Sequence, residues 1–244
     1  MKEIKFGDFS KSLITDTSSS IDTKEYNVFK KTLKSYKNKA VYIYSFKEGK
    51  MLYTSGWYDL LGYRDEEMNM LLYVNLTSTK YSQFSNELND KALLFLRQKT
   101  NDLESYSFTL DLEKIHKDGS HIPIFSRVSV FKASNGIVEQ IIGVSEAVNS
   151  LRLGDVMQYA AYGPDKTNFE ETLNKDLFNH FAISRKEKEA LQLASEGFCF
   201  KEIAHKLNVS NSAIEKRIIP MYKRFKVNSL THLVSFAFRN NILK

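Results

Sequence analysis

Hydrophobic residues in the last quarter of the chain recur every three to four positions, the spacing of amphipathic helices. This spacing predicts four helices, which span residues 184–197, 201–207, 211–225 and 228–240. The positions expected to face their common core are Ala190, Leu191, Ala194, Ile203, Ala204, Leu207, Ile214, Ile218, Met221 and Phe225. Residues 208–210 form a short polar turn between the second and third helices. We therefore predict a helix-turn-helix at the centre of an all-α, four-helix domain.

Local signals mark the ends of these helices. Ser184 with Glu187, and Ser212 with Glu215, have the spacing of a capping box at a helix start. Pro220 lacks a backbone donor, and its ring clashes with a preceding carbonyl. We therefore expect a kink or a local widening of the third helix at this residue.

Residues 24–148 show a different pattern, in which short helical segments lie between β-rich runs. Two runs around a turn at 47–50 predict a hairpin, and three later runs predict an antiparallel meander. The later strands are expected at 105–115, 121–132 and 137–148, and the helices at 24–36, 57–62 and 75–100. Asp-Gly at 118–119 and Asn-Gly at 135–136 supply the positive φ that tight turns need. The combination predicts an α+β domain with an antiparallel sheet.

These patterns divide the chain into four segments. We expect a mobile or loosely packed tail at 1–23, the α+β domain at 24–148, a linker at 149–180 and the all-α domain at 181–244. Short helices are expected on either side of Gly163-Pro164 in the linker.

Positive charge is concentrated in the last of these segments. Residues 181–244 contain 12 Lys and Arg against 5 Glu, whereas residues 1–180 contain 23 Lys and Arg against 24 Asp and Glu. A basic surface attracts polyanions by neutralising phosphates and releasing counterions. The all-α domain is therefore predicted to bind nucleic acid.

Several other classes of protein are disfavoured. Cys199 is the only cysteine, so no intrachain disulfide or thiolate zinc site can form, which fits a reducing cytosol. No apolar run approaches the roughly 20 residues that span a bilayer, and the N-terminus does not resemble a secretory signal. No nucleophile–base pair, metal-ligand cluster or phosphate-binding glycine loop is present. We expect a cytoplasmic, non-enzymatic protein with no metal, no catalytic residues and no membrane contact.

The order of elements in residues 40–148 resembles that of a PAS domain. The segment LLGYRDEEM is similar to the Gly-Tyr-x-x-Glu-Glu turn of that family, and HKDGSHIPI is similar to its Asp-Gly hairpin. The resemblance implies a domain that binds a small ligand in a hollow between sheet and helices, or that forms dimers. No cofactor is predicted, and the ligand is unknown. The aromatic residues that would line such a hollow, or simply fill a closed core, include Tyr42, Tyr44, Tyr53, Trp57, Phe108 and Phe125.

Residues 181–244 resemble the LuxR-type helix-turn-helix of bacterial transcription regulators. The matching residues are Glu187, Leu191, Gly197, Lys201, Glu202, Ile203, Ala204, Leu207, Val209, Ser210, Val227 and Asn228. The third helix departs from the family, because Glu215 stands where a DNA-facing Lys is common and Pro220 where Asn is usual. The sequence preference of the family therefore cannot be transferred.

The start of the third helix is expected to meet base edges in the major groove. The outward positions there are Asn211, Ser212, Glu215, Lys216 and Ile219, and the cations expected on phosphates are Lys201, Arg217, Lys223 and Arg224. The alternative is that these charges only solvate the surface of the helix.

Apolar residues of the fourth helix are candidates for pairing two subunits. They are Leu233, Val234, Ala237 and Phe238. The helix at 24–36 either packs on its own domain or forms part of a dimer. The favoured reading is a homodimeric transcription regulator that binds double-stranded DNA. The alternative is a ligand-binding or protein-interaction module whose helical domain contacts another protein, such as RNA polymerase.

Overall fold

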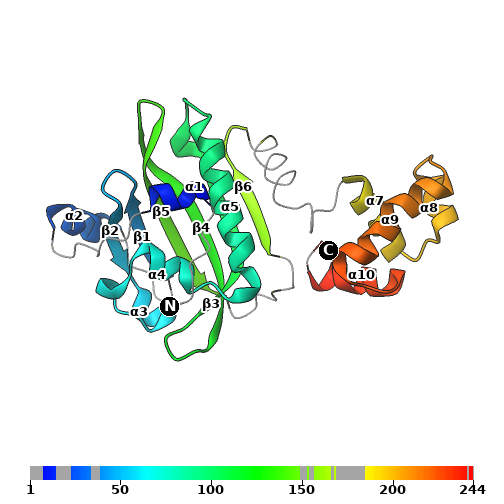
Figure 1. Cartoon of the computed structure of the whole chain (residues 1–244), viewed down its shortest axis with the longest axis horizontal. Coiled ribbons are helices and arrows are strands. Elements are labelled where there is room, and N and C mark those ends of the chain that lie inside the picture. The colour runs from blue at the N-terminus through cyan, green and yellow to red at the C-terminus, as the bar shows by residue number, and fades with distance from the viewer. Residues whose placement is uncertain are drawn as a thin grey trace. The chain divides into compact units, whose positions relative to one another are not determined.

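A six-stranded antiparallel sheet with the strand order β2-β1-β5-β4-β3-β6 is the framework of the N-terminal unit (Figure 1). The structure, a computed structural model, describes residues 8–14, 23–33, 39–148, 153, 157–165, 168, 185–240 and 242–243. The chain divides into two units, one of residues 1–153 and 157–173 and one of residues 154–156 and 174–244.

The elements of the N-terminal unit follow the predicted order. The strands are β1 (Lys39–Ser45), β2 (Lys50–Ser55), β3 (Ser107–Ile115), β4 (His121–Ser134), β5 (Ile137–Ala147) and β6 (Gln158–Tyr162). The helices are α1 (Asp8–Leu13), α2 (Lys24–Thr32), α3 (Trp57–Leu61), α4 (Met70–Asn75) and α5 (Thr79–Arg97), with 3-10 turns η1 (Asp65–Glu67) and η2 (Leu103–Ser105). Two strands, a run of short helices and a three-strand meander give a PAS-like α+β unit, so the predicted fold class is confirmed.

Turn residues set the register of the meander. Asn135 and Gly136 have φ of 50° and 72°, as a tight hairpin turn between twisted strands requires. Gly119 has φ of 90° in the turn between β3 and β4. The two turns bring Phe108 opposite Val128, and Val128 opposite Gly143.

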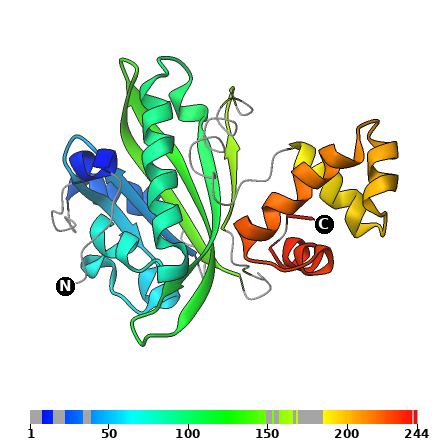
Figure 2. The ribbon, with the colours of Figure 1, turned by 45° about the vertical axis from the view of Figure 1, so that its right-hand side comes forward.

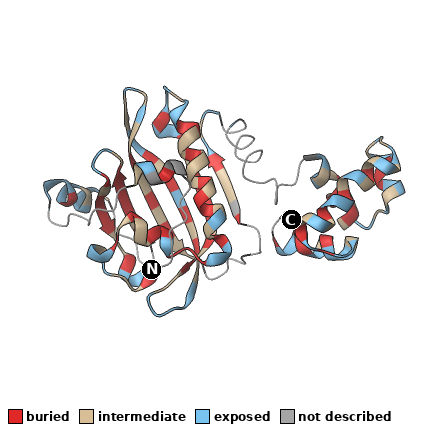
Figure 3. Cartoon of the chain, viewed as in Figure 1, coloured by how far each residue is buried: buried red, intermediate tan, exposed pale blue. Residues whose placement is uncertain are grey.

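One face of the sheet is covered by α5, which crosses it in Figure 2. Alternate residues of β3 on this face (Phe108, Leu110 and Leu112) are buried, since side chains of a strand point to its two faces in turn. Leu88 and Ala92 of α5 are buried as well. Figure 3 shows buried residues, in red, along both the helix and the strands that it covers. This face of the sheet and α5 enclose the core of the unit.

Helix α2 packs on its own unit. The ring of Tyr53 lies 5.2 Å from that of Tyr26 and 6.2 Å from that of Phe29, centroid to centroid. The Phe29 ring also meets Phe131, 5.8 Å away. Of the two readings of this helix, the structure therefore favours packing within its own domain, although Val28 remains exposed.

Two segments outside the predicted core of the unit are ordered against it. Helix α1 lies within the segment expected as a tail, and the Ser10 backbone N–H donates to Oδ1 of Asp90 in α5, at 2.7 Å. Residues 158–162, for which a short helix was expected, form β6 instead. Strand β4 pairs with one edge of β3, and β6 pairs with the other edge. In this pairing Ala161 lies opposite Phe108 and is fully buried. Tertiary pairing thus overrides the weak strand propensity of an alanine-containing segment.

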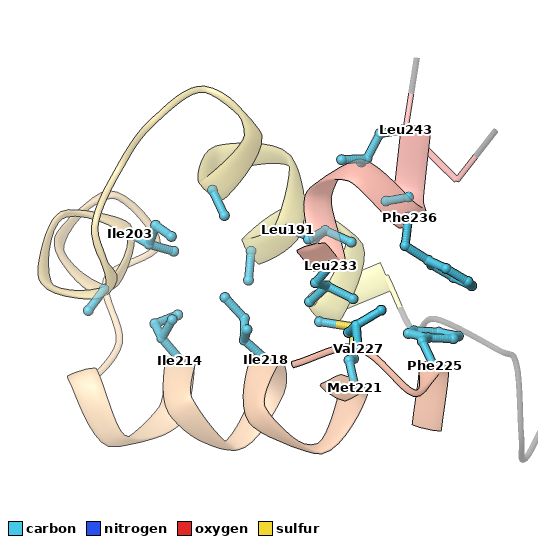
Figure 4. Packing of buried hydrophobic residues seen from close by; sticks show 14 residues of the cluster. Leu191, Ile203, Ile214, Ile218, Met221, Phe225, Val227, Leu233, Phe236 and Leu243 are labelled. Carbon is cyan, nitrogen blue, oxygen red and sulfur yellow. The ribbon is translucent and has the colours of Figure 1, made fainter. Parts of the chain in front are cut away.

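The C-terminal unit contains four helices in its described part. They are α7 (Arg185–Ser195), α8 (Phe200–Lys206), α9 (Asn211–Phe225) and α10 (Leu230–Arg239). Figure 4 shows Leu191, Ile203 and Ile214 pointing into the same core, together with Ile218 and Leu233. The predicted core positions are buried except Leu207, which is partly buried against the cluster.

The helix starts differ from the sequence prediction. Ser210, not Ser212, caps α9, because its hydroxyl accepts from the Ala213 N–H at 3.2 Å. Ser184 lies outside the described residues. Helix α9 keeps its α-helical assignment through Pro220, which is exposed, and the expected kink stays a prediction.

Candidate nucleic-acid interface and sheet cavity

Helices α8 and α9 and their connecting turn form a helix-turn-helix. The Glu202 carboxylate accepts from the Cys199 N–H at 2.7 Å, which caps α8. After α8, Asn208 adopts the left-handed conformation (φ of 52°), and the Val209 N–H donates to the carbonyl of Ala204 at 3.0 Å. These local bonds turn the chain sharply before Ser210 starts α9.

The apolar side of α9 determines which of its residues face outward. Its buried residues are Ile214, Ile218, Met221 and Phe225, three or four positions apart. The predicted base-facing residues lie on the remaining sides of the helix. Ser212 and Lys216 are exposed, and Ile219 is 51% exposed although it is aliphatic. Within the C-terminal unit, this side of α9 is accessible to a partner.

Asn211 and Glu215 form a pair at the start of α9. Nδ2 of Asn211 donates to Oε1 of Glu215 at 2.8 Å, and both side chains are half-buried. Oδ1 of Asn211 is buried and has no hydrogen-bond partner among the described residues. The amide therefore fixes the position of the carboxylate.

The four predicted phosphate-binding cations are in different environments. Lys201 and Lys223 are exposed, and Arg217 is half-buried. Arg224 forms an ion pair with Glu187 of α7, and both side chains are mostly buried. The guanidinium of Arg224 is thus paired with a carboxylate of its own unit, which disfavours the expected contact with phosphate.

The apolar residues of α10 serve mainly the core of their own unit. Leu233 and Ala237 are fully buried, and Val234 is partly buried against the same cluster. A residue enclosed by its own unit cannot contact a second subunit, so Leu233 and Ala237 are withdrawn from the dimerisation candidates. Phe238 is 45% exposed and stays a candidate.

A cavity of about 60 Å³ lies between α5 and the sheet in the N-terminal unit. Three of the six predicted aromatic residues line it: Tyr42, Tyr44 and Phe108. Gly143 lies opposite Tyr42 in the sheet, and a Cβ there would overlap the Tyr42 ring. The absence of a side chain at this position lets the ring lie across β5.

The other three predicted aromatic residues lie outside the cavity. Trp57 is fully buried, stacks on Tyr42, and donates from its indole nitrogen to the Val41 carbonyl at 3.2 Å. Tyr53 packs under α2 on the opposite face of the sheet. Phe125 pairs with Asp111 and alternates with the buried Ile124, which places it on that opposite face as well. Trp57 and Tyr53 therefore fill cores, and none of the three lines the cavity.

A buried lysine in the cavity wall was missed by the sequence analysis. Lys114 of β3 is 2% exposed, and its Nζ donates to the Tyr73 carbonyl at 2.6 Å and to the Thr77 hydroxyl at 2.8 Å. Nζ also lies 3.7 Å from the centroid of the Tyr73 ring. Burial lowers the pKa of Lys114 to about 7, because an ammonium loses its hydration there.

One signal in the sequence could have identified Lys114. It follows Phe108, Leu110 and Leu112 at the two-residue spacing of one strand face, and those three residues are apolar. A charged residue at the end of such a run is buried only if it has hydrogen-bond partners. The partners lie at the end of α4, and their proximity to β3 could not be predicted from the sequence.

The described part of the chain offers few alternative chemistries. Among its residues, no group of three or more His, Cys, Asp or Glu could hold a metal ion. None of its helices is both long and apolar enough to cross a bilayer. The distinctive features are the outward side of α9 and the cavity with its buried lysine.

Helices α8 and α9 and their turn make the C-terminal unit a helix-turn-helix domain in which one side of α9 is exposed. Residues 182–237 match the family model for bacterial regulatory proteins of the luxR family. The C-terminal unit is thus a LuxR-type DNA-binding domain, the kind that bacterial transcription regulators carry.

Three solved structures are similar to the chain over most of its length. The VqmA dimer of Vibrio cholerae in the absence of target DNA is 13% identical, with 88% of this chain and 87% of that chain covered and a TM-score of 0.34. A Vibrio cholerae VqmA–ligand–DNA complex is 14% identical, with 91% and 90% covered and a TM-score of 0.33. The LOV protein of Rhodobacter sphaeroides is 9% identical, with 83% and 90% covered and a TM-score of 0.37. Residue roles cannot be transferred at such low similarity.

Proposed function

We propose that the protein is a homodimeric transcription regulator that binds double-stranded DNA through α9 and receives a signal at its PAS-like unit. The observation that carries the proposal is the outward side of α9, which its own unit leaves accessible in a domain rich in cations. A helix inserted in the major groove presents the residues near its N-terminus to base edges. Ser212, Glu215 and Lys216 occupy those positions.

Two of the predicted phosphate-binding cations, Lys201 and Lys223, are exposed and can contact the phosphates that flank a groove. Lys201 lies at the start of α8, and Lys223 lies in the last turn of α9. Contacts to phosphates position a protein on the duplex without reading its sequence. Each neutralised phosphate contributes about 0.9 to the slope of the logarithm of affinity against the logarithm of salt concentration.

The test is a selection of genomic fragments by the full chain, followed by sequencing and by titration of the recovered site. We expect an enriched sequence whose affinity falls steeply with salt concentration. The double variant Lys201→Ala/Lys223→Ala should reduce the salt slope by about 2 on every duplex. Lys30→Ala, which removes an exposed cation of α2, is the matched control. Equal recovery of all fragments, with no dependence on salt, would contradict the proposal.

The dimer is assigned to the exposed part of α10, where Phe238 and Val234 remain as candidates. Two copies of α9 separated by about 34–36 Å would meet half-sites one helical turn apart. Light scattering of the protein, free and on the selected duplex, measures the number of chains. A single chain in both states would exclude the dimer, and dimers that persist in Phe238→Ser would exclude this surface.

Signal reception is assigned to the cavity beside Lys114. A volume of about 60 Å³ accommodates a ligand of roughly five heavy atoms, if each needs the 10–15 Å³ that one water needs. Among the described residues that line it, most are apolar and Lys114 is the one cation, so a small molecule with one hydrogen-bond acceptor fits best. Thermal shifts with small carboxylates and amides, on wild type and on Lys114→Met, test this. Shifts that are equal in both proteins would exclude Lys114 as the recognition group.

A further inference from the structure

The outward side of α9 carries two residues that a purely phosphate-binding helix would not need. Glu215 is an anion in a unit with a large excess of cations, and Ile219 is an aliphatic side chain that is 51% exposed. Residues four positions apart lie on the same side of an α-helix, one turn from each other. Glu215 and Ile219 therefore present a carboxylate and an alkyl group to the same partner.

Other carboxylates of the unit are engaged within it. Glu187 forms an ion pair with Arg224, Glu202 caps α8, and Glu196 accepts from the Gln192 amide at 3.2 Å. Glu215 also accepts from an amide, as Glu196 does, and it forms no ion pair in the described part of the chain. Its bond comes from the neutral amide of Asn211.

The chemistry of duplex DNA limits what these two groups can contact. A carboxylate is repelled by phosphates, so on a DNA-facing surface its favourable contact is with an amino group on a base edge. In the major groove, Glu accepts a hydrogen bond from the N4 amino group of cytosine. An alkyl side chain in the same groove contacts the C5-methyl group of thymine.

Geometry gives the spacing between the two bases. Four residues of an α-helix rise about 6 Å, and base pairs of B-DNA are stacked about 3.4 Å apart. For a helix that follows the groove, this rise corresponds to about two base-pair steps.

From this geometry we propose that Glu215 recognises the N4 amino group of a cytosine and that Ile219 contacts the methyl group of a thymine about two base pairs away. Asn211 is a positioning residue that holds the carboxylate toward the groove. The inference rests on the proposed function and deepens it, since it specifies which bases the regulator selects.

The experiment begins with sites selected from random duplexes by the full chain. The recovered sites should contain a cytosine and a thymine at this spacing. Replacing the C·G pair by a T·A pair should lower the affinity of wild type about fivefold or more. The same replacement should lower the affinity of Glu215→Ala less than about twofold. Replacing the thymine by uracil removes only its methyl group. This change should lower the affinity of wild type about fourfold, the effect of one buried methylene. It should leave the affinity of Ile219→Ala unchanged.

Further variants separate positioning from contact. Asn211→Ala should reduce the preference for cytosine and leave the thymine-to-uracil ratio as in wild type. The matched controls are Glu196→Gln, a carboxylate outside α9, and Val28→Ala, an exposed aliphatic residue of α2. Both controls should keep the discrimination of wild type.

Two outcomes overturn the inference. The first is that the selected sites lack the cytosine–thymine pair, and the second is that Glu215→Ala and Ile219→Ala discriminate between bases as wild type does. If the protein still binds all duplexes in a salt-dependent manner in these cases, the proposed function survives and only the base assignment fails. If it binds no duplex at low salt, the proposed function itself fails.

Discussion

Lys114 of the N-terminal unit and three lysines of the C-terminal unit are placed in opposite ways. In the N-terminal unit, Lys114 is buried and bonded to a backbone carbonyl and a hydroxyl. In the C-terminal unit, Lys201, Lys216 and Lys223 are exposed. The buried amine is held by two fixed partners of its own unit, whereas the exposed cations are accessible to a polyanion. The charge of a side chain therefore indicates function only when its burial is known.

Substitutions on the two sides of α10 should give the largest difference in the free energy of unfolding. Leu233→Ala removes a fully buried side chain and should destabilise the C-terminal unit by about 2–5 kcal/mol. Phe238→Ala, on the exposed side, should change the free energy of unfolding of that unit by less than about 0.5 kcal/mol. Far-ultraviolet circular dichroism during unfolding of the full chain measures both. Comparable losses of stability in the two variants would contradict the placement of Leu233 on the buried side and Phe238 on the exposed side of α10.

Lys114 should make the stability of the N-terminal unit depend on pH. Its pKa in the folded state is about 7, below the usual value of 10.5, so above pH 7 the unfolded chain holds a proton that the folded chain has released. The free energy of unfolding should therefore rise from pH 7 to about 9, by an amount on the order of a few kcal/mol. Below pH 7 the cost of burying the ammonium is present in full.

Trp57, the only tryptophan and fully buried, reports on the unfolding of this unit by its fluorescence. Lys114→Met should remove the rise with pH, and Lys30→Ala should keep it. Measurements stay below pH 10 because burial raises the pKa values of Tyr42 and Tyr73, whose ionisation would destabilise the fold at higher pH. A stability that is flat with pH in wild type would contradict the burial of a proton-binding amine.

The ion pair of Arg224 and Glu187 is the exception among the cations of the C-terminal unit, and a double-mutant cycle tests it. Glu187→Gln should destabilise the unit by about 1–3 kcal/mol, since a charged hydrogen bond is lost in a mostly enclosed site. Adding Arg224→Met should cost much less than it does in wild type. If Arg224→Met instead leaves stability unchanged and lowers the salt slope of DNA binding, the residue belongs with the phosphate-binding cations.

Much of the fold could be predicted because local signals agree with it. The Asn135-Gly136 turn fixed the β4–β5 hairpin, and the spacing of Ile214, Ile218 and Met221 defined the buried side of α9. The strand β6 could not be predicted, because it is stabilised by pairing with the edge of β3 and not by the strand propensity of its own residues.

The candidate sites were less predictable than the elements that carry them. Both faces of β4 include apolar residues, so alternation alone could not place Phe125 outside the cavity. An apolar stripe such as that of α10 is the same whether it meets its own core or a second subunit. Leu233 therefore looked like an interface residue and is a core residue. The burial of Lys114 and the pairing of Arg224 depend on residues far away in the chain.

We propose that the outward side of α9 reads base sequence while the cations around it bind phosphates. The direct test compares Lys216→Ala and Lys223→Ala on the selected duplex and on a scrambled one, at several salt concentrations. We expect Lys216→Ala to lose about 1–3 kcal/mol of binding free energy on the selected duplex and much less on the scrambled one. Lys223→Ala should weaken both duplexes equally and lower the salt slope by about 0.9. Equal losses on both duplexes for Lys216→Ala would contradict the claim.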